Sequence, residues 1–151
     1  MKKLLVLALV AMIGATAFSK TIDEVFNAFP KADNMQDMVI DENMINMAMS
    51  MGADQSGALK DITSMRILTI ENPSSEQLAT AKSIMQEGVD DFDVMVDASD
   101  EGESALILTQ GNDKLINKML IIAVEDDDVA IVLMEGNINP DYANKYVNFG
   151  K

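Results

Sequence analysis

The residues with the clearest chemical potential are four methionines within ten positions, in the segment Asn43–Gly52 (NMINMAMSMG). If this segment is a helix, Met44, Met47 and Met51 fall at positions i, i+3 and i+7 and share one face. Thioether sulfurs bind soft ions such as copper(I) or silver(I), so these three methionines are the candidate ligands of a soft-metal site. The same spacing suits the apolar side of a helix that packs on a sheet, because methionine fills irregular cores readily.

We favour core packing for this methionine face, aimed at the sheet. A straight helix separates Met44 from Met51 by about 10 Å, at about 1.5 Å per residue. A copper(I) site needs roughly three converging soft ligands, so Met35 and Met38 would have to fold back to complete one. The chain has no histidine to help. The sequence therefore predicts no metal site and no cofactor, with soft-metal binding as the alternative function.

The absence of cysteine and histidine from the chain excludes several kinds of chemistry. Disulfides, thiolate nucleophiles and thiolate metal sites require cysteine. The Ser-His-Asp arrangement and most zinc sites require histidine. Carboxylates remain, but their spacing indicates no facing pair of acids. We therefore expect no enzymatic activity and assign no catalytic residue.

Two charged features have ordinary structural interpretations. Arg66, the only arginine of the chain, lies in the middle of an expected strand. There it should form an ion pair or donate to carbonyl oxygens, with a small anion site as the alternative. The acidic run Glu125–Asp128 is typical of a solvated hairpin tip whose charges discourage aggregation, although clustered oxygens are also the ligands of calcium.

The N-terminus has the three-part pattern of a secretory signal peptide. Met1–Lys3 is basic, Leu4–Ile13 is continuously apolar, and Gly14–Ser19 is rich in small residues. We expect cleavage after Ser19, with cleavage after Ala17 as the alternative. Ten apolar residues are too few to span a bilayer, and a lipid anchor would need a cysteine after the cut. The expected product is an exported protein of the periplasm or cell envelope, or a secreted one, with no stable membrane anchor.

The net charge restricts the class of partner. The formal charge of the full chain is −14, and residues 1–19 contribute two lysines and no acid to it. Such a chain repels phosphate backbones, so nucleic acid is not expected as a partner.

Residues 20–151 are expected to form a single α+β domain. The expected helices span residues 21–29, residues 41–51, a segment opened by residues 72–76 and a terminal segment opened by residues 139–141 that contains Tyr142 and Tyr146. The third helix has Leu78, Ala81, Met85 and Val89 on one face. The expected strands span residues 38–40, 62–70, 93–98, 104–109, 115–124 and 129–134. The last four strands are joined by short turns, as in an antiparallel meander. The pattern predicts a single antiparallel-rich sheet of about six strands packed by helices in two layers.

The last two expected strands are apolar at both odd and even positions ("KMLIIAV" and "VAIVLM"). Both faces of those strands should therefore be dry. The second face could be shielded locally by the chain, or it could be covered by a second copy or a protein partner. The latter would make it a contact surface for a partner or a homo-oligomer.

The chain resembles a known family, the bacterial exported "domain of unknown function 4252" proteins. The resemblance rests on the signal peptide, the opening "MVIDENMINMAMSM", the strand "ITSMRILTIEN" and the closing "VAIVLMEGNINPDYANKY". Many relatives look like lipoproteins with a cysteine at the cleavage site, and this sequence departs from them there. The family implies no activity and no functional residues. The expected function is a non-enzymatic exported binding or interaction protein of the cell envelope.

Overall fold

The computed structural model describes residues 19–52 and 59–141. Within these ranges the helices are α2 (Ile22–Asn27), α3 (Glu42–Ser50) and α4 (Ser75–Glu87). The strands are β1 (Met35–Ile40), β2 (Ile62–Glu71), β3 (Asp93–Asp100), β4 (Glu103–Gly111), β5 (Ile116–Val124) and β6 (Asp128–Ile138). The predicted signal peptide, apart from Ser19, and the terminal helix beyond Asp141, with Tyr142 and Tyr146, lie outside the described residues.

Each described helix begins where its capping residue predicts. The hydroxyl of Thr21 accepts a hydrogen bond from the backbone N–H of Glu24, whose carboxylate accepts one from the N–H of Thr21, so the two residues form a capping box. Ser74 and Gln77 form a second capping box at the start of α4. The carboxylate of Asp41 caps α3. Local hydrogen bonding thus sets the start of all three helices.

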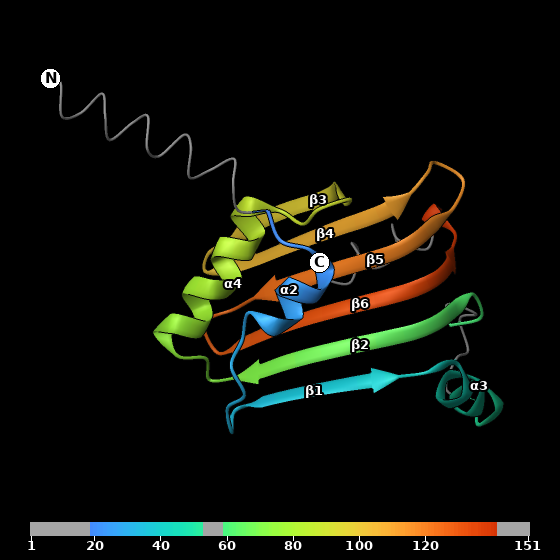
Figure 1. Ribbon diagram of the computed structural model, residues 1–151, viewed down its shortest axis with the longest axis horizontal. Coiled ribbons are helices and arrows are strands. Elements are labelled where there is room, and N and C mark those ends of the chain that lie inside the picture. The colour runs from blue at the N-terminus through green and yellow to red at the C-terminus, as the bar shows by residue number, and fades with distance from the viewer. Residues whose placement is uncertain (1–18, 53–58, 142–151) are drawn as a thin grey trace, which may run out of the picture.

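The strands form a six-stranded antiparallel sheet in the order β1-β2-β6-β5-β4-β3 (Figure 1). The run from β3 to β6 is a meander, because each of these strands pairs with the next one in the sequence. The predicted α+β class and the predicted meander of the last four strands are confirmed. Among the described strands, β1 and β3 form the two edges of the sheet.

The sheet separates two hydrophobic cores. On one face α2 and α4 pack over the central strands (Figure 1), and Val25, Ala81 and Ile84 from these helices are fully buried. On the other face the core contains Ile45 of α3 and is rich in methionine. The helices therefore pack on both faces of the sheet. The sequence suggested two layers, one of sheet and one of helices, and α3 adds cover on the second face.

The second face of the sheet is buried within the chain. Met119 of β5, Met134 of β6 and Ile107 of β4 are at most 5% exposed, and Met49 of α3 packs partly against the same core. Of the two arrangements that the sequence left open, the structure favours local shielding. In the described part of the chain, no helix is long and apolar enough to cross a membrane.

Burial of both faces predicts that truncation on either face destabilises the isolated chain. Met119 and Leu120 are neighbours in β5, point to opposite faces and are both fully buried. Met119→Ala and Leu120→Ala should each lower the free energy of unfolding by about 2–5 kcal/mol, measured by urea denaturation. Met47→Ala, on an exposed side chain, is the control and should change it by less than about 0.5 kcal/mol. A near-neutral Met119→Ala would mean that the second face is open.

Candidate interaction surface

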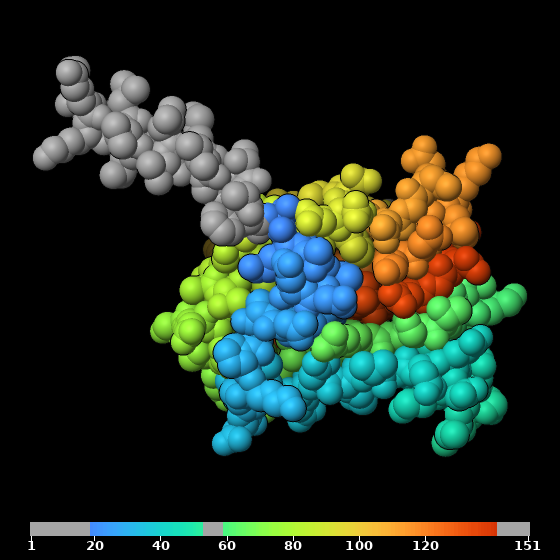
Figure 2. Space-filling view, viewed as in Figure 1, coloured from blue at the N-terminus to red at the C-terminus, as the bar shows by residue number. Residues whose placement is uncertain are grey.

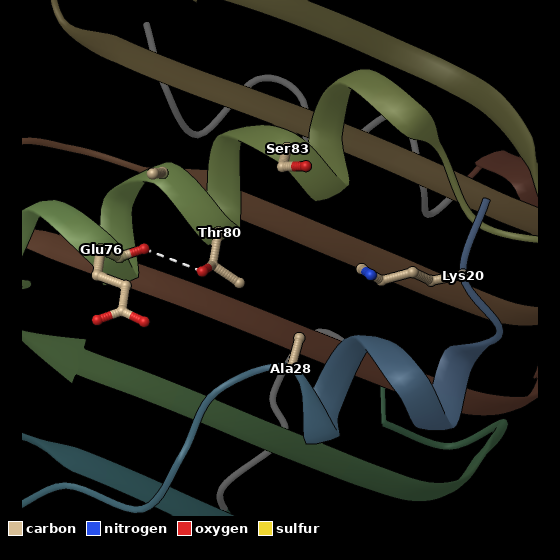
Figure 3. A pocket seen from close by; sticks show the side chains of 6 residues that line it. Lys20, Ala28, Glu76, Thr80 and Ser83 are labelled. Atoms are coloured by element: carbon tan, nitrogen blue, oxygen red, sulfur yellow. Dashed lines mark hydrogen bonds between the residues drawn. The ribbon is translucent and has the colours of Figure 1, made fainter. Parts of the chain in front are cut away.

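A shallow hollow lies between α2 and α4 on the outer side of the helix layer (Figure 3). Its volume is about 480 Å³, and it is lined by Lys20, Ala28, Glu76, Ala79, Thr80 and Ser83. The Thr80 hydroxyl donates to the backbone carbonyl of Glu76 at 2.9 Å, a bond within the helix. The charged groups of the lining are one lysine and one glutamate. The Ser83 hydroxyl donates to the carboxylate of Glu87 at 3.2 Å, also within the helix.

Arg66 anchors the edge strand β1 to the sheet. Its Nε and Nη2 atoms donate to the two carboxylate oxygens of Asp37 at 3.1 and 2.8 Å. Asp37 and Arg66 are diagonal neighbours on one face of the β1–β2 pair. The guanidinium also lies over the ring of Phe26 in α2, 4.3 Å from its centroid. The ion pair predicted for Arg66 is confirmed. Because Asp37 takes two of the donors of Arg66 and neutralises its charge, the structure gives no support to an anion site there.

The same ion pair perturbs the titration of its members. The hydrogen bonds from Arg66 lower the pKa of Asp37 below its ordinary value, partial burial opposes this, and the charge of Arg66 adds to the lowering. The bonds to Asp37 raise the pKa of Arg66. This pair therefore stays charged at neutral pH and binds β1 electrostatically to β2.

The methionines of α3 lie on the opposite side of the helix from the one predicted. Met44, Met47 and Met51 are 48%, 63% and 80% exposed, so the prediction that they pack against the sheet is wrong. Ile45 is buried instead, and Met49 packs partly against the second core. The helix carries two apolar stripes, and the one with the β-branched Ile45 docks while the methionine stripe faces solvent.

Exposed apolar side chains concentrate at this edge of the molecule, on α3 and on both sides of β1, where Met38 and Val39 point to opposite faces of the sheet. Seven large apolar side chains are exposed among the described residues, and five of them lie between residues 38 and 51. We call these five the β1–α3 surface: Met38, Val39, Met44, Met47 and Met51. Figure 2 shows β1 and α3 side by side at the lower edge of the molecule. Clustered exposed apolar side chains mark interaction sites more often than scattered ones do.

The sequence reasoning missed two members of this surface, Met38 and Val39. It treated residues 38–40 as a brief strand and did not identify that strand as an edge. An edge position could have been inferred from the short length and from the isolation of β1 ahead of a helix. The exposure of both alternating side chains is what an edge strand allows.

The structure gives the soft-metal alternative no support. Met44, Met47 and Met51 follow one solvent-facing flank of α3, and Met35 packs against the core on the first face. The described residues contain no group of three or more acids that could hold a metal ion. The acidic run Glu125–Asp128 forms an exposed hairpin tip, closed by a 2.8 Å backbone bond between its first and last residues.

Comparison with known proteins identifies a family but no activity. The chain matches the family described as "Domain of unknown function (DUF4252)" over residues 26–146. This range covers β1, α3 and the whole sheet. No curated protein and no solved structure matches the chain.

The exposure of the α3 methionines predicts an order of oxidation. Dilute hydrogen peroxide should convert Met51, Met47 and Met44 to sulfoxides before Met119 and Met134, because peroxide must reach the thioether sulfur. Peptide mass spectrometry over a time course measures each rate. The same protein unfolded in urea is the control, in which the rates should become similar. Equal rates in the folded protein would contradict the observed orientation of α3.

The Asp37–Arg66 pair predicts a pH-dependent contribution to stability. Asp37→Asn should lower the free energy of unfolding at neutral pH by about 0.2–1 kcal/mol, the range for a partly exposed pair. Because the folded pKa of Asp37 is lowered, this contribution is present above the unfolded value of about 3.9 and is lost as pH falls through the folded value. Denaturation between pH 7 and pH 2 measures it, with Asp97→Asn in β3 as the control. A difference that persists at pH 2 would argue against the ion pair as its cause.

Proposed function

The chain belongs to the DUF4252 family, and we propose that it is an exported, non-enzymatic protein of the cell envelope that binds a protein partner through the β1–α3 surface. The observation that carries this proposal is the gathering of Met38, Val39, Met44, Met47 and Met51 at one exposed edge. Such a patch adds little to folding, because its members remain in water. Its apolar area becomes favourable when a partner covers it.

The chemistry of methionine suits such a contact. The side chain is unbranched, flexible and polarizable, so it adapts its shape to different partners. Three of the five members of the surface follow one stripe of a capped helix, which holds their backbones in place while their side chains remain free to adapt. Ser50 adds to this rigidity, because its hydroxyl donates to the carbonyl of Met47 at 2.8 Å.

A non-enzymatic role agrees with the composition and with the hollow between α2 and α4. The chain contains neither cysteine nor histidine, which removes the most common nucleophile–base pairs. The polar groups that line the hollow are a lysine, a glutamate and two hydroxyls, and both hydroxyls are bonded within their own helix.

The contacts of the first described residues support the exported form of the proposal. Lys20 forms a parallel bridge with Val89, and its carbonyl accepts a 2.8 Å bond from the N–H of Asp90. Ser19 donates a side-chain hydrogen bond to the carboxylate of Asp90. Cleavage after either Ala17 or Ser19 keeps Lys20 in the chain, so the folded domain retains its bridge to Val89.

Site-specific crosslinking tests this function. A photo-reactive amino acid replaces Met47 in the full chain, and this variant is expressed in the native host of the protein. After irradiation, the envelope fraction should contain the protein without its signal segment, shown by mass spectrometry, together with one discrete adduct. The control position is Val94, an exposed valine in β3 at the other edge of the sheet, which should give no such adduct.

A matched pair of variants tests the apolar nature of this contact. In the Met47 crosslinking protein, Met44→Gln with Met51→Gln should abolish the adduct, because glutamine is polar but of similar length. Met44→Leu with Met51→Leu should preserve it. Absence of any adduct from position 47, or the same products from position 94, would refute the proposed function.

A further inference from the structure

We infer that the β1 edge accepts an extended segment of a partner protein as an additional strand, and that this segment carries lysine or arginine at its ends and apolar side chains between them. This inference rests on the proposed function and specifies how the partner is bound. Its basis is the difference between the two edges of the sheet and the distribution of charge along β1.

The two edges differ in their protection against further pairing. The edge strand β3 carries Asp93, Asp97 and Asp100 and has a register shift between Val94 and Val96. Charges and bulges are the usual means by which proteins keep an edge from pairing with another chain. The strand β1 pairs with β2 in regular register over its whole length, without a bulge.

The one charge within β1 does not protect its edge. Asp37 is the only charged residue of the strand, and its carboxylate is held by Arg66 of the neighbouring strand at 2.8 and 3.1 Å. The middle of the edge is therefore apolar, with Met38 and Val39 both exposed. Among the described strands β1 has a single neighbour, β2, so backbone groups on its outer side are available for a strand that adds to the sheet.

Acidic residues lie at both ends of this apolar strand. Asp41 and Glu42 follow it directly, and Asp33 precedes it. At that first end, Glu71 of β2 donates its N–H to the carbonyl of Asn34 at 2.9 Å, which brings a second acid alongside. Lys31 is the one basic residue within five positions of either end. A strand with basic ends and an apolar middle therefore complements β1 along its whole length.

The same charges disfavour a second copy of this chain as the occupant. Antiparallel pairing of two β1 strands about Met38 would bring Asp33 of each copy alongside residues 41–43 of the other. The strands would lie about 5 Å apart, so Asp33 of one copy would lie opposite residue 43 and close to Glu42 of the other, at both ends. The net charge of −14 on each copy adds to this repulsion.

A designed peptide tests the inference with the purified mature chain. The probe has two lysines at each end and six residues of alternating valine and threonine between them. We expect binding by calorimetry and slower hydrogen–deuterium exchange at the amides of β1, with no change at β3. A peptide with the same middle and glutamate ends should bind at least about tenfold more weakly.

Two matched variants locate the binding. Val39 and Val94 are valines of the two edge strands and are 62% and 61% exposed, which makes them a matched pair of positions for the same substitution. Val39→Lys should weaken peptide binding at least about tenfold by repulsion and loss of apolar contact, whereas Val94→Lys should leave it unchanged. The pair Asp41→Asn and Glu42→Gln, which retains a capping group on α3, should weaken binding by about threefold or more and reduce its dependence on salt.

The outcomes separate this inference from the proposed function. Equal binding of the lysine-ended and glutamate-ended peptides, or equal effects of Val39→Lys and Val94→Lys, overturns the inference. So does a stable dimer of the mature chain that Val39→Lys dissociates, since the occupant would then be a second copy. If the peptide does not bind while crosslinking from Met47 still yields an adduct, strand addition is refuted and the proposed function stands.

Discussion

The structure depends on burying both faces of one antiparallel sheet. Adjacent residues of β5 and β6 are apolar, so Met119 and Leu120 point into different cores although they follow each other in the chain. The helices α2 and α4 cover only one face of the sheet. On the other face, α3 contributes Ile45 and Met49 to the second core. The central strands thus bury apolar side chains on both faces, and most of the large apolar side chains that remain exposed lie near the edges of the sheet.

The two edge strands, β1 and β3, differ in how they are protected against pairing with another chain. The acids and the bulge of β3 keep that edge from pairing, whereas the single acid of β1 is committed to Arg66. This ion pair links three elements, because the guanidinium of Arg66 also rests on Phe26 of α2. The contact that fixes β1 in place also neutralises the charge that could have protected it, so a firmly held strand presents an uncharged edge.

The sequence predicted those features of the fold that local interactions determine. The capping residues Thr21 and Asp41 located the starts of two helices, and the alternation and turn composition located the meander. It could not predict the rotation of α3, because Ile45 and Met49 form one apolar stripe while Met44, Met47 and Met51 form another, at equally helical spacings. The stripe that docks is the one that packs against residues of β2, β5 and β6. These strands are far from α3 in the sequence, so the periodicity within ten residues carries no information about them.

The choice of stripe has a chemical consequence for the exposed surface. An exposed leucine would offer comparable apolar area with fewer accessible shapes, whereas the flexible thioether of Met47 can adapt to a partner. The same thioether is open to oxidation to a polar sulfoxide while it is solvent-exposed. The partner that we propose would protect these side chains while it covers them, and its dissociation would expose them to an oxidation that weakens rebinding. On this argument, adaptability and chemical vulnerability at the β1–α3 surface have the same origin, because both require methionine side chains that the sheet does not cover.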